Sequence, residues 1–300
     1  MGAELVDEDG GATPGAADGG FRRTPHAGRH LCAALASPYS GGRVSSAAEL
    51  AQLANALLRC RATPDYVPAL NGLQVDNRAP IARIAAAVDC SQRTIRGAID
   101  VGANMLVVHH GLFWGGLQPL TGTYLERVRV LLGHDVALYA AHLPLDAHES
   151  MGNSFLLARA LGLEPEGGFA RYQTIFCGVQ GTSDVTTDAL VSACDRFARE
   201  HGGRAIASPH PGGRRTRRWG VVTGAGITGD TLREAVDLGL DTVITGEGPH
   251  WSAIEAEEKG LVLVYAGHYA TETLGVQALA TWLAAHAGVP WNFVEAPTGL

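Results

Sequence analysis

The sequence predicts a two-lobed α/β protein in which mostly parallel sheets are flanked by helices. From about residue 45 onward, short apolar runs typical of strands alternate with segments of helical length and period. Strands joined by such helices form largely parallel sheets that are covered on both faces. A glycine-containing break at residues 164–173 divides this pattern into two blocks. We therefore expect a first lobe over residues 44–165 and a second lobe with the C-terminal helix over residues 166–300.

The first 43 residues are expected to be a disordered extension. They are dominated by Gly, Ala and Pro and show neither a helical nor a strand period. The ordered part is predicted to begin near Ser46, because Ser46 and Glu49 have the spacing of a helix capping box. Leucines at positions 50, 53, 57 and 58 then supply the apolar stripe of a helix.

In the first block the apolar periods predict strands that alternate with helices. The expected strands cover residues 81–90, 104–110 and 136–146, and the expected helices cover residues 91–103, 124–135 and 153–163. Asn153 or Ser154 is expected to cap the last of these helices.

The second block continues the alternation up to a long C-terminal helix. The expected strands cover residues 172–180, 218–226, 241–247 and 261–268, and the expected helices cover residues 182–202 (after a turn), 231–240, 250–260 and 271–288. The glycine-rich stretch "TGAGITGD" at 223–230 matches no complete phosphate-loop or dinucleotide motif. We therefore predict that it forms a tight turn from a strand to a helix.

Composition narrows the class of protein. The formal net charge of −7 argues against nucleic acid as a main partner. The five cysteines show no CxxC spacing, which argues against a disulfide framework and against a structural zinc site and favours a cytoplasmic location. No apolar run reaches the roughly 18–20 residues that a membrane span needs.

Side chains of metal-binding and acid types follow four of the predicted strands. They are His109 and His110, then His142 and Asp146, then Glu247, and finally His268 and Glu272. The carboxyl ends of parallel strands meet at one edge of a sheet, where ligands bind. Neighbouring residues of a strand point to opposite faces, so His109 and His110 would suit two adjacent ions if the strand ends there. Alternatively, one imidazole is bonded in the core and the other faces solvent.

Three further residues join this pair in the metal hypothesis. If a helix begins just after Gly267, His268 and Glu272 stand at i and i+4 on one face, and the carboxylate could bridge two cations. Asp146 would supply another oxygen ligand. Taken singly, Glu272 could instead stabilise a first helical turn, and Asp146 could cap a turn. Taken together, these residues favour one metal site.

The ligand types restrict the metal and its chemistry. Imidazole and carboxylate without thiolate suit Zn, Fe, Mn, Co or Ni. Five protein ligands cannot saturate two divalent ions, so positions stay open for water or substrate. Two ions about 3.5–4 Å apart activate water and hold substrate oxygens, which makes metal-assisted hydrolysis the expected reaction class.

With these residues in view, the sequence resembles the NIF-three-like dinuclear-metal-centre protein family, whose bacterial members are often named GTP cyclohydrolase I type 2 homologues. The resemblance covers nearly everything from about residue 45 to the end. Its motifs are "DYVPALNGLQVDN" (65–77), "MLVVHHGLFW" (105–114), "AAHLPLDAHESMGNSFLLA" (140–158), "DTVITGEGPHWSAIEAEEKG" (241–260) and "AGHYATETLGVQAL" (266–279).

The resemblance implies a specific division of the ligands. His110 and Asp146 would hold one ion, His109 and His268 the other, and Glu272 would bridge them. It also implies that the site lies in the cleft between the lobes and that the chain forms a homohexamer. In position 111 a glycine stands where the family usually has proline.

The reaction is less closely defined than the metal site. A GTP cyclohydrolase activity would need a proton donor or acceptor, and His142, Glu247 and His250 are the candidates. Each could instead orient a metal ligand. The first functional hypothesis is thus a metal-dependent hydrolase of a small nucleotide or phosphate-bearing substrate. The alternative is a metal-binding regulatory or interaction protein without turnover.

Overall fold

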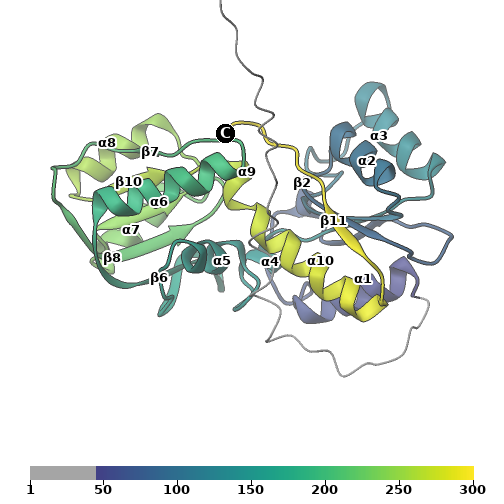
Figure 1. Cartoon of the computed structure of the whole chain (residues 1–300), viewed down its shortest axis with the longest axis horizontal. Coiled ribbons are helices and arrows are strands. Elements are labelled where there is room, and N and C mark those ends of the chain that lie inside the picture. The colour runs from purple at the N-terminus through teal and green to yellow at the C-terminus, as the bar shows by residue number, and fades with distance from the viewer. Residues whose placement is uncertain (1–44) are drawn as a thin grey trace, which may run out of the picture. The chain divides into compact units, whose positions relative to one another are not determined.

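The computed structural model describes residues 45–300, which lie within one compact unit. The predicted disordered extension over residues 1–43 lies outside the described residues. The described chain forms two β-sheets flanked by helices, which confirms the predicted α/β class (Figure 1). Among the helices of this range, none combines the length and the apolar character needed to cross a membrane.

The first sheet has five strands in the order β1-β4-β3-β2-β11. These strands are β1 (Gly72–Val75), β2 (Ile84–Asp89), β3 (Met105–His110), β4 (Ala137–Ala140) and β11 (Trp291–Phe293). Strands β4, β3, β2 and β11 are parallel, and only β1 pairs antiparallel, at the edge. β1 and β11 escaped sequence prediction because runs of three or four residues are too short to show a period.

Helices cover both faces of this sheet. They are α1 (Ala47–Leu57), α2 (Gln92–Asp100), α3 (Gly122–Gly133) and α10 (Thr273–Ala287). Successive side chains of β2 alternate between the faces: Ile84 packs with α1 and α10, whereas Ala85 packs with α2 and α3. Helix α1 begins with the predicted capping box, in which Ser46 accepts from Glu49 N–H and the Glu49 side chain accepts from Ser46 N–H.

The second sheet has six strands in the order β5-β6-β8-β9-β10-β7. The strands are β5 (Gly167–Tyr172), β6 (Ile175–Thr186), β7 (Ile206–Ala207), β8 (Arg215–Val222), β9 (Thr242–Thr245) and β10 (Val262–Tyr265). Only β8, β9 and β10 run parallel to one another, so this sheet is mixed rather than mostly parallel. The antiparallel strands are β6, which pairs with β5 and β8, and β7, which pairs with β10. β6 also continues through residues 182–186, where the sequence predicted a turn.

The second sheet is likewise sandwiched between helices. Helices α5 (Asn153–Ala160) and α6 (Thr187–Glu200) pack on one face, and α7 (Gly229–Asp237) and α8 (His250–Glu258) pack on the other. Gly152 caps α5, which corrects the prediction that Asn153 or Ser154 would do so. Two helices of one turn, α4 (Leu143–Asp146) and α9 (His268–Thr271), follow strands β4 and β10.

The C-terminal segment returns to the first sheet. Helix α10 follows α9 and buries Leu279 and Leu283 among residues of α1, β2 and β3. Figure 1 shows α10 running from α9 toward α1. Strand β11 then pairs with β2. The chain therefore crosses between the sheets twice, before α5 and after α9. Residue 165, the predicted lobe boundary, lies between α5 and β5.

Candidate metal centre

The two adjacent histidines stand at the carboxyl end of the central strand β3. His109 is fully buried, and His110 is the last residue of the strand. Their rings lie 4.8 Å apart between centroids and are tilted by 51°. Both rings therefore point toward the same region. The sequence analysis expected this arrangement only if the strand ends at this pair. An arrangement with one imidazole buried and the other in solvent does not occur.

The i, i+4 pair is formed as the sequence predicted. Gly267 adopts a φ of +93°, a conformation that glycine tolerates, and α9 begins at the next residue. Nε2 of His268 consequently lies 3.1 Å from Oε2 of Glu272. Glu272 itself is buried, with only 4% of its surface exposed.

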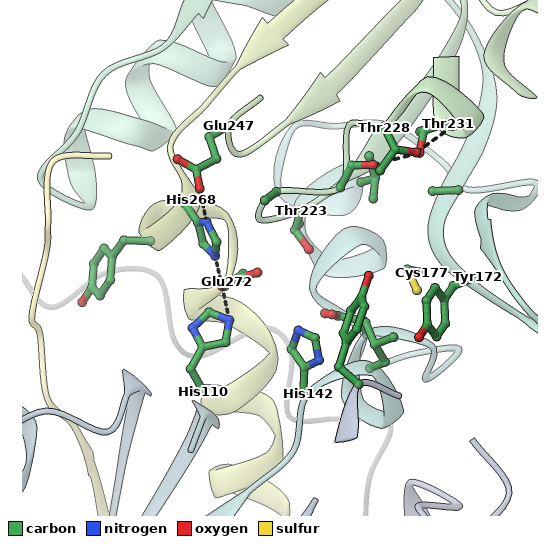
Figure 2. Close-up of a pocket in the computed structure, with 18 of the residues that line it drawn as sticks. His110, His142, Tyr172, Cys177, Thr223, Thr228, Thr231, Glu247, His268 and Glu272 are labelled. Carbon is green, nitrogen blue, oxygen red and sulfur yellow. Dashed lines mark hydrogen bonds and ion pairs between the residues drawn. The ribbon is translucent and has the colours of Figure 1, made fainter. Parts of the chain in front are cut away.

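Glu272 lies between two groups of side chains. Its Oε1 is 3.6 Å from Nε2 of His109, which is also 3.4 Å from Oδ2 of Asp146. Its Oε2 is 3.5 Å from Nε2 of His110 and 3.1 Å from that of His268. Figure 2 shows His110, Glu272 and His268 facing one another in the cavity. Ligand atoms of these three residues lie close enough together to hold a metal ion.

Glu272 is the residue that joins the ligands into one cluster. His109 contacts both Asp146 and Glu272, and Glu272 also contacts His110 and His268. Glu272 therefore lies in the central position.

The other ring nitrogen of each ligand histidine is held by an acceptor. Nδ1 of His109 donates to the carbonyl of Ala141 at 2.9 Å. Nδ1 of His110 donates to Asp89 at 2.9 Å, and Nδ1 of His268 donates to Glu247 at 2.8 Å. Because carbonyls and carboxylates only accept, Nδ1 carries a proton in each ring, and Nε2 is the nitrogen that faces the cluster. Such outer hydrogen bonds orient imidazoles that bind metals.

Asp146 is oriented by a neighbour on the next helix. Nδ2 of Asn153 donates to Oδ1 of Asp146 at 2.9 Å, which leaves Oδ2 toward His109. Oδ1 of Asn153 accepts from the backbone N–H of Gly275 at 2.7 Å. Asn153 thus connects α4, α5 and α10 at the site, whereas the sequence suggested only a helix cap for it.

The glycine-rich stretch at 223–230 forms the predicted turn between β8 and α7, and it also borders the cluster. Gly224 has a φ of +58°, and its N–H donates to Oγ1 of Thr271 at 3.1 Å. A Cβ at this position would overlap Oε1 of Glu272 and lie 3.3 Å from Nε2 of His268. The turn therefore allows a close approach of backbone to carboxylate.

The charges in the cluster suit a cation. Burial alone raises the pKa of Glu272, but the imidazoles of His110 and His109 outweigh it and hold that pKa well below its usual range. Burial lowers the pKa of His109, yet Asp146 and Glu272 together raise it well above its usual value. For His268 the same carboxylate outweighs burial and raises the pKa to about 9.

Two buried polar atoms support the fit of a metal directly. Among the described residues, Nε2 of His109 and Oε2 of Glu272 are buried without a hydrogen-bond partner. Unsatisfied buried polar atoms are costly and uncommon in folded proteins. Imidazole nitrogens and carboxylate oxygens are the donors that divalent Zn, Fe, Mn, Co and Ni accept. The donor set therefore fits divalent metal ions.

The cluster opens into a cavity of about 680 Å³. Residues from both sheets line it. The lining includes the aromatic side chains of Tyr66, Trp114 and Tyr172, which contact one another through Tyr66, and the side chains of Thr223, Thr228 and Thr231. A volume of this size accommodates a small-molecule ligand.

The three predicted proton-transfer residues occupy different positions. His142 and Glu247 line the cavity. Nδ1 of His142 bonds to Asp65 at 2.8 Å, and Glu247 accepts from His268. His250 is exposed at the start of α8, and it is not among the residues that line the cavity.

Three carboxylate and amide residues of the site were not singled out from the sequence. Asp65 holds His142, which lies 77 residues later in the chain, and Asn153 holds Asp146 across a gap of 7 residues. Asp89 ends strand β2, beside His110 in the parallel register. The rule that ligands collect at the carboxyl ends of parallel strands would have found Asp89.

Known proteins resemble this chain over most of its length. The family model for Duf34/NIF3 (NGG1p interacting factor 3) matches residues 46–298. A GTP cyclohydrolase 1 type 2 homolog of Deinococcus radiodurans is 43% identical over 84% of this chain and 94% of its own length. The homolog of that name in Halobacterium salinarum is 41% identical over 81% of this chain and 95% of its own length.

Solved structures show the same fold. The protein ybgI, described as of unknown function, superposes with a TM-score of 0.75 at 33% identity, over 85% of this chain and all of that one. TTHA1606 from Thermus thermophilus gives a TM-score of 0.73 at 37% identity with the same coverage. The chain described here belongs to the DUF34/NIF3 family.

Proposed function

We propose that the protein holds two divalent metal ions and hydrolyses a small nucleotide or another phosphate-bearing molecule. The observation that carries the proposal is the pair of buried atoms without a hydrogen-bond partner, Nε2 of His109 and Oε2 of Glu272. His109, His110, Asp146, His268 and Glu272 would hold the ions, with Glu272 between them. Zn, Fe, Mn, Co and Ni all suit these donors.

The chain's own residues orient the site for such a reaction. When bound, two divalent ions supply Lewis acidity that lowers the pKa of water and polarises substrate oxygens. Ala141, Asp89 and Glu247 keep the imidazoles in fixed orientations through their Nδ1 protons. This rigidity restricts the ligands and leaves the cavity side open to substrate.

Glu247 is suited to move a proton. Its Oε1 accepts from His268, and nearly half of its side-chain surface (44%) is exposed. Oε2 can therefore exchange a proton with a bound substrate or with solvent. Within the proposal, Glu247 holds His268 with one oxygen and serves as acid or base with the other.

The substrate class rests on the relatives' names and on the cavity. The name GTP cyclohydrolase 1 type 2 homolog points to opening of the guanine imidazole ring of GTP by water. A cavity of about 680 Å³ accommodates a molecule of nucleotide size. The aromatic side chains of Tyr66, Trp114 and Tyr172 offer flat surfaces for a base.

We also propose that the chain assembles with itself, as a homohexamer by family resemblance. Several large apolar side chains are exposed, including Val67, next to the cavity residue Tyr66, and Leu117 and Leu120, shortly after the cavity residue Trp114. Apolar groups exposed in clusters favour association. Light scattering after size-exclusion chromatography gives the subunit number, and a monomer at micromolar concentration would reject the assembly.

A second candidate function is metal binding without turnover, in a regulatory or interaction protein. The observation that favours it is the sparse proton-transfer machinery. His250 lies outside the cavity lining, and Glu247 is already engaged by His268. A metal site used for sensing needs no further acid or base.

One experiment separates the two functions. Wild-type protein, a chelator-treated sample and the variant Glu272→Gln are compared for metal content and for turnover of GTP, nucleotide phosphoesters and short peptides. Glu258→Gln on α8 is the matched control, because Glu258 is exposed and away from the cluster. The hydrolase proposal expects turnover by the wild type and the control only. Full metal occupancy in the wild type without turnover of any of these substrates supports the binding protein instead.

A further inference from the structure

A fourth histidine faces the cluster, outside the set of ligands predicted from the sequence. His142 follows strand β4 and retains only 8% of its surface exposed. Its ring centroid lies 4.9 Å from that of His109 and 5.6 Å from that of His110. One ligand nitrogen from each of these three histidines lies within 4.8 Å of the other two. Figure 2 shows the His142 ring beside His110, directed into the cavity.

The outer hydrogen bond of His142 matches those of the other three histidines. Its Nδ1 lies 2.8 Å from Oδ1 of Asp65. A carboxylate at this distance accepts from Nδ1–H, so the proton resides on Nδ1 and the lone pair on Nε2. His110 and His268 have the same arrangement, with Asp89 and Glu247 as acceptors. A carboxylate, an imidazole and a metal in series are a common arrangement in metal sites.

The backbone around His142 is fixed as firmly as its ring. Oδ2 of Asp65 accepts from Leu143 N–H at 2.9 Å and from Nδ2 of Asn71 at 2.7 Å. Oδ1 of Asn71 accepts from His142 N–H at 2.7 Å. Asp65 and Asn71 together leave the ring little freedom to turn away from the cluster. These bonds give a physical role to the motif at residues 65–77.

We infer that His142 is a sixth metal ligand, which binds through Nε2, and that Asp65 is its positioning residue. The inference rests on the metal site of the proposed function, but it does not require turnover. It assigns His142 to the metal rather than to the proton transfer considered from the sequence. His142 would add an imidazole to one of the two ions, beside His109 and His110. Fewer positions would then remain open for substrate.

Cobalt binding tests the inference. Metal-free protein is titrated with Co²⁺ against a competing chelator, and the electronic spectrum is recorded for the wild type, His142→Gln, Asp65→Asn and His250→Gln. We expect His142→Gln to lower the affinity for one of the two ions by at least about 10-fold and to change the cobalt absorption bands. Asp65→Asn should act on the same ion in the same direction, but less strongly. His250→Gln is the matched control, because His250 is exposed and outside the cavity lining, and it should bind as the wild type does.

A second measurement needs no variant and so does not depend on the folding of one. In wild-type protein labelled with ¹⁵N-histidine, saturating Zn²⁺ should shift the Nε2 signals of four histidines rather than three. Three shifted signals, or wild-type affinity and an unchanged cobalt spectrum in His142→Gln, would overturn the inference. Absence of turnover in a fully loaded wild type would reject only the hydrolase. A wild type that takes up no metal would reject both the metal site and the sixth ligand.

Discussion

The backbone of Gly224 packs against the carboxylate of Glu272. The two residues lie on different elements: Gly224 in the turn after β8, and Glu272 between α9 and α10. A Cβ on residue 224 would clash with Oε1 of Glu272. The turn thus limits the position of the Glu272 carboxylate between His109 and His110. Geometry at the cluster therefore depends on a residue that contributes no side chain.

Substituting this glycine should damage metal binding. Gly224→Ala forces Glu272 to move and also strains a backbone with a φ of +58°. We expect metal affinity to fall by about 10- to 100-fold, as for other changes that displace a ligand without removing it. Chelator competition measures the change.

Gly229→Ala is the matched control for this prediction. Gly229 lies in the same glycine-rich stretch, at the start of α7, and a Cβ there would meet only the end of the Arg233 side chain at 3.9 Å. It should bind metal as the wild type does. If Gly224→Ala also kept wild-type metal affinity, the close contact between Gly224 and Glu272 would not be needed for metal binding.

Helix α10 should contribute strongly to stability through the first sheet. Leu283 is completely buried in the cluster that contains Leu50 and Ile84. Replacing such a leucine by alanine removes apolar contacts and leaves a cavity, at a cost of about 2–5 kcal/mol in the free energy of unfolding. Urea denaturation of Leu283→Ala measures the loss. Leu132→Ala on α3 is the control: with 56% of its surface exposed, it should change stability by less than about 0.5 kcal/mol.

The sequence predicted the longer elements of the fold but not how they are distributed between the sheets. Periodicity located most of the helices and the central strands because each buries one face or both. The destination of α10 depends on which apolar surface it meets, and here that surface belongs to strands about 190 residues earlier in the chain. The hairpin of β5 and β6 was missed for a different reason. Gly167 and Gly168 suggested a break in the sequence, whereas both residues pair with β6 in the sheet.

Asp65 should stabilise the folded protein at neutral pH. Burial alone raises the pKa of this carboxyl, but the hydrogen bond from His142 and its other donors lower the net value below 3.8. A lowered folded-state pKa means that the stabilisation is present above the unfolded pKa and is lost as pH falls through the folded pKa. We expect Asp65→Asn to cost about 2–3 kcal/mol at pH 7, as for hydrogen bonds to a charged group. The difference from wild type should shrink below about pH 4.

Urea denaturation of the metal-free proteins at pH 7 and at pH 3.5 tests this dependence. Asp76→Asn is the control, because Asp76 is exposed on the same segment and accepts only from the neighbouring Asn77 N–H. It should cost little at either pH. An equal loss for Asp65→Asn at both pH values would show that the charge of Asp65 contributes nothing.

The candidate ligands were easier to foresee than the residues that hold them. His109, His110 and Glu272 stand at strand ends or at helical spacing, where sequence position alone suggests convergence. Asp65 bonds to His142, 77 residues away in sequence, and Asn153 bonds to Asp146, 7 residues away. Such bonds leave no period in the chain. They follow only from the folded geometry.

Metal binding should release protons near neutral pH. Without an ion, the carboxylate of Glu272 outweighs burial and raises the pKa of His268 to about 9, and the pKa of His109 is also raised. Raised values mean that these imidazoles carry protons at pH 7, and a cation must displace them because only the neutral ring binds a metal. Apparent affinity should therefore increase with pH and level off above about pH 9. Calorimetric titrations with Zn²⁺ at pH 7, in two buffers with different ionisation enthalpies, measure the protons released. Identical binding enthalpies in both buffers would mean that the cluster holds no displaceable proton, and the charge arrangement around Glu272 would need another explanation.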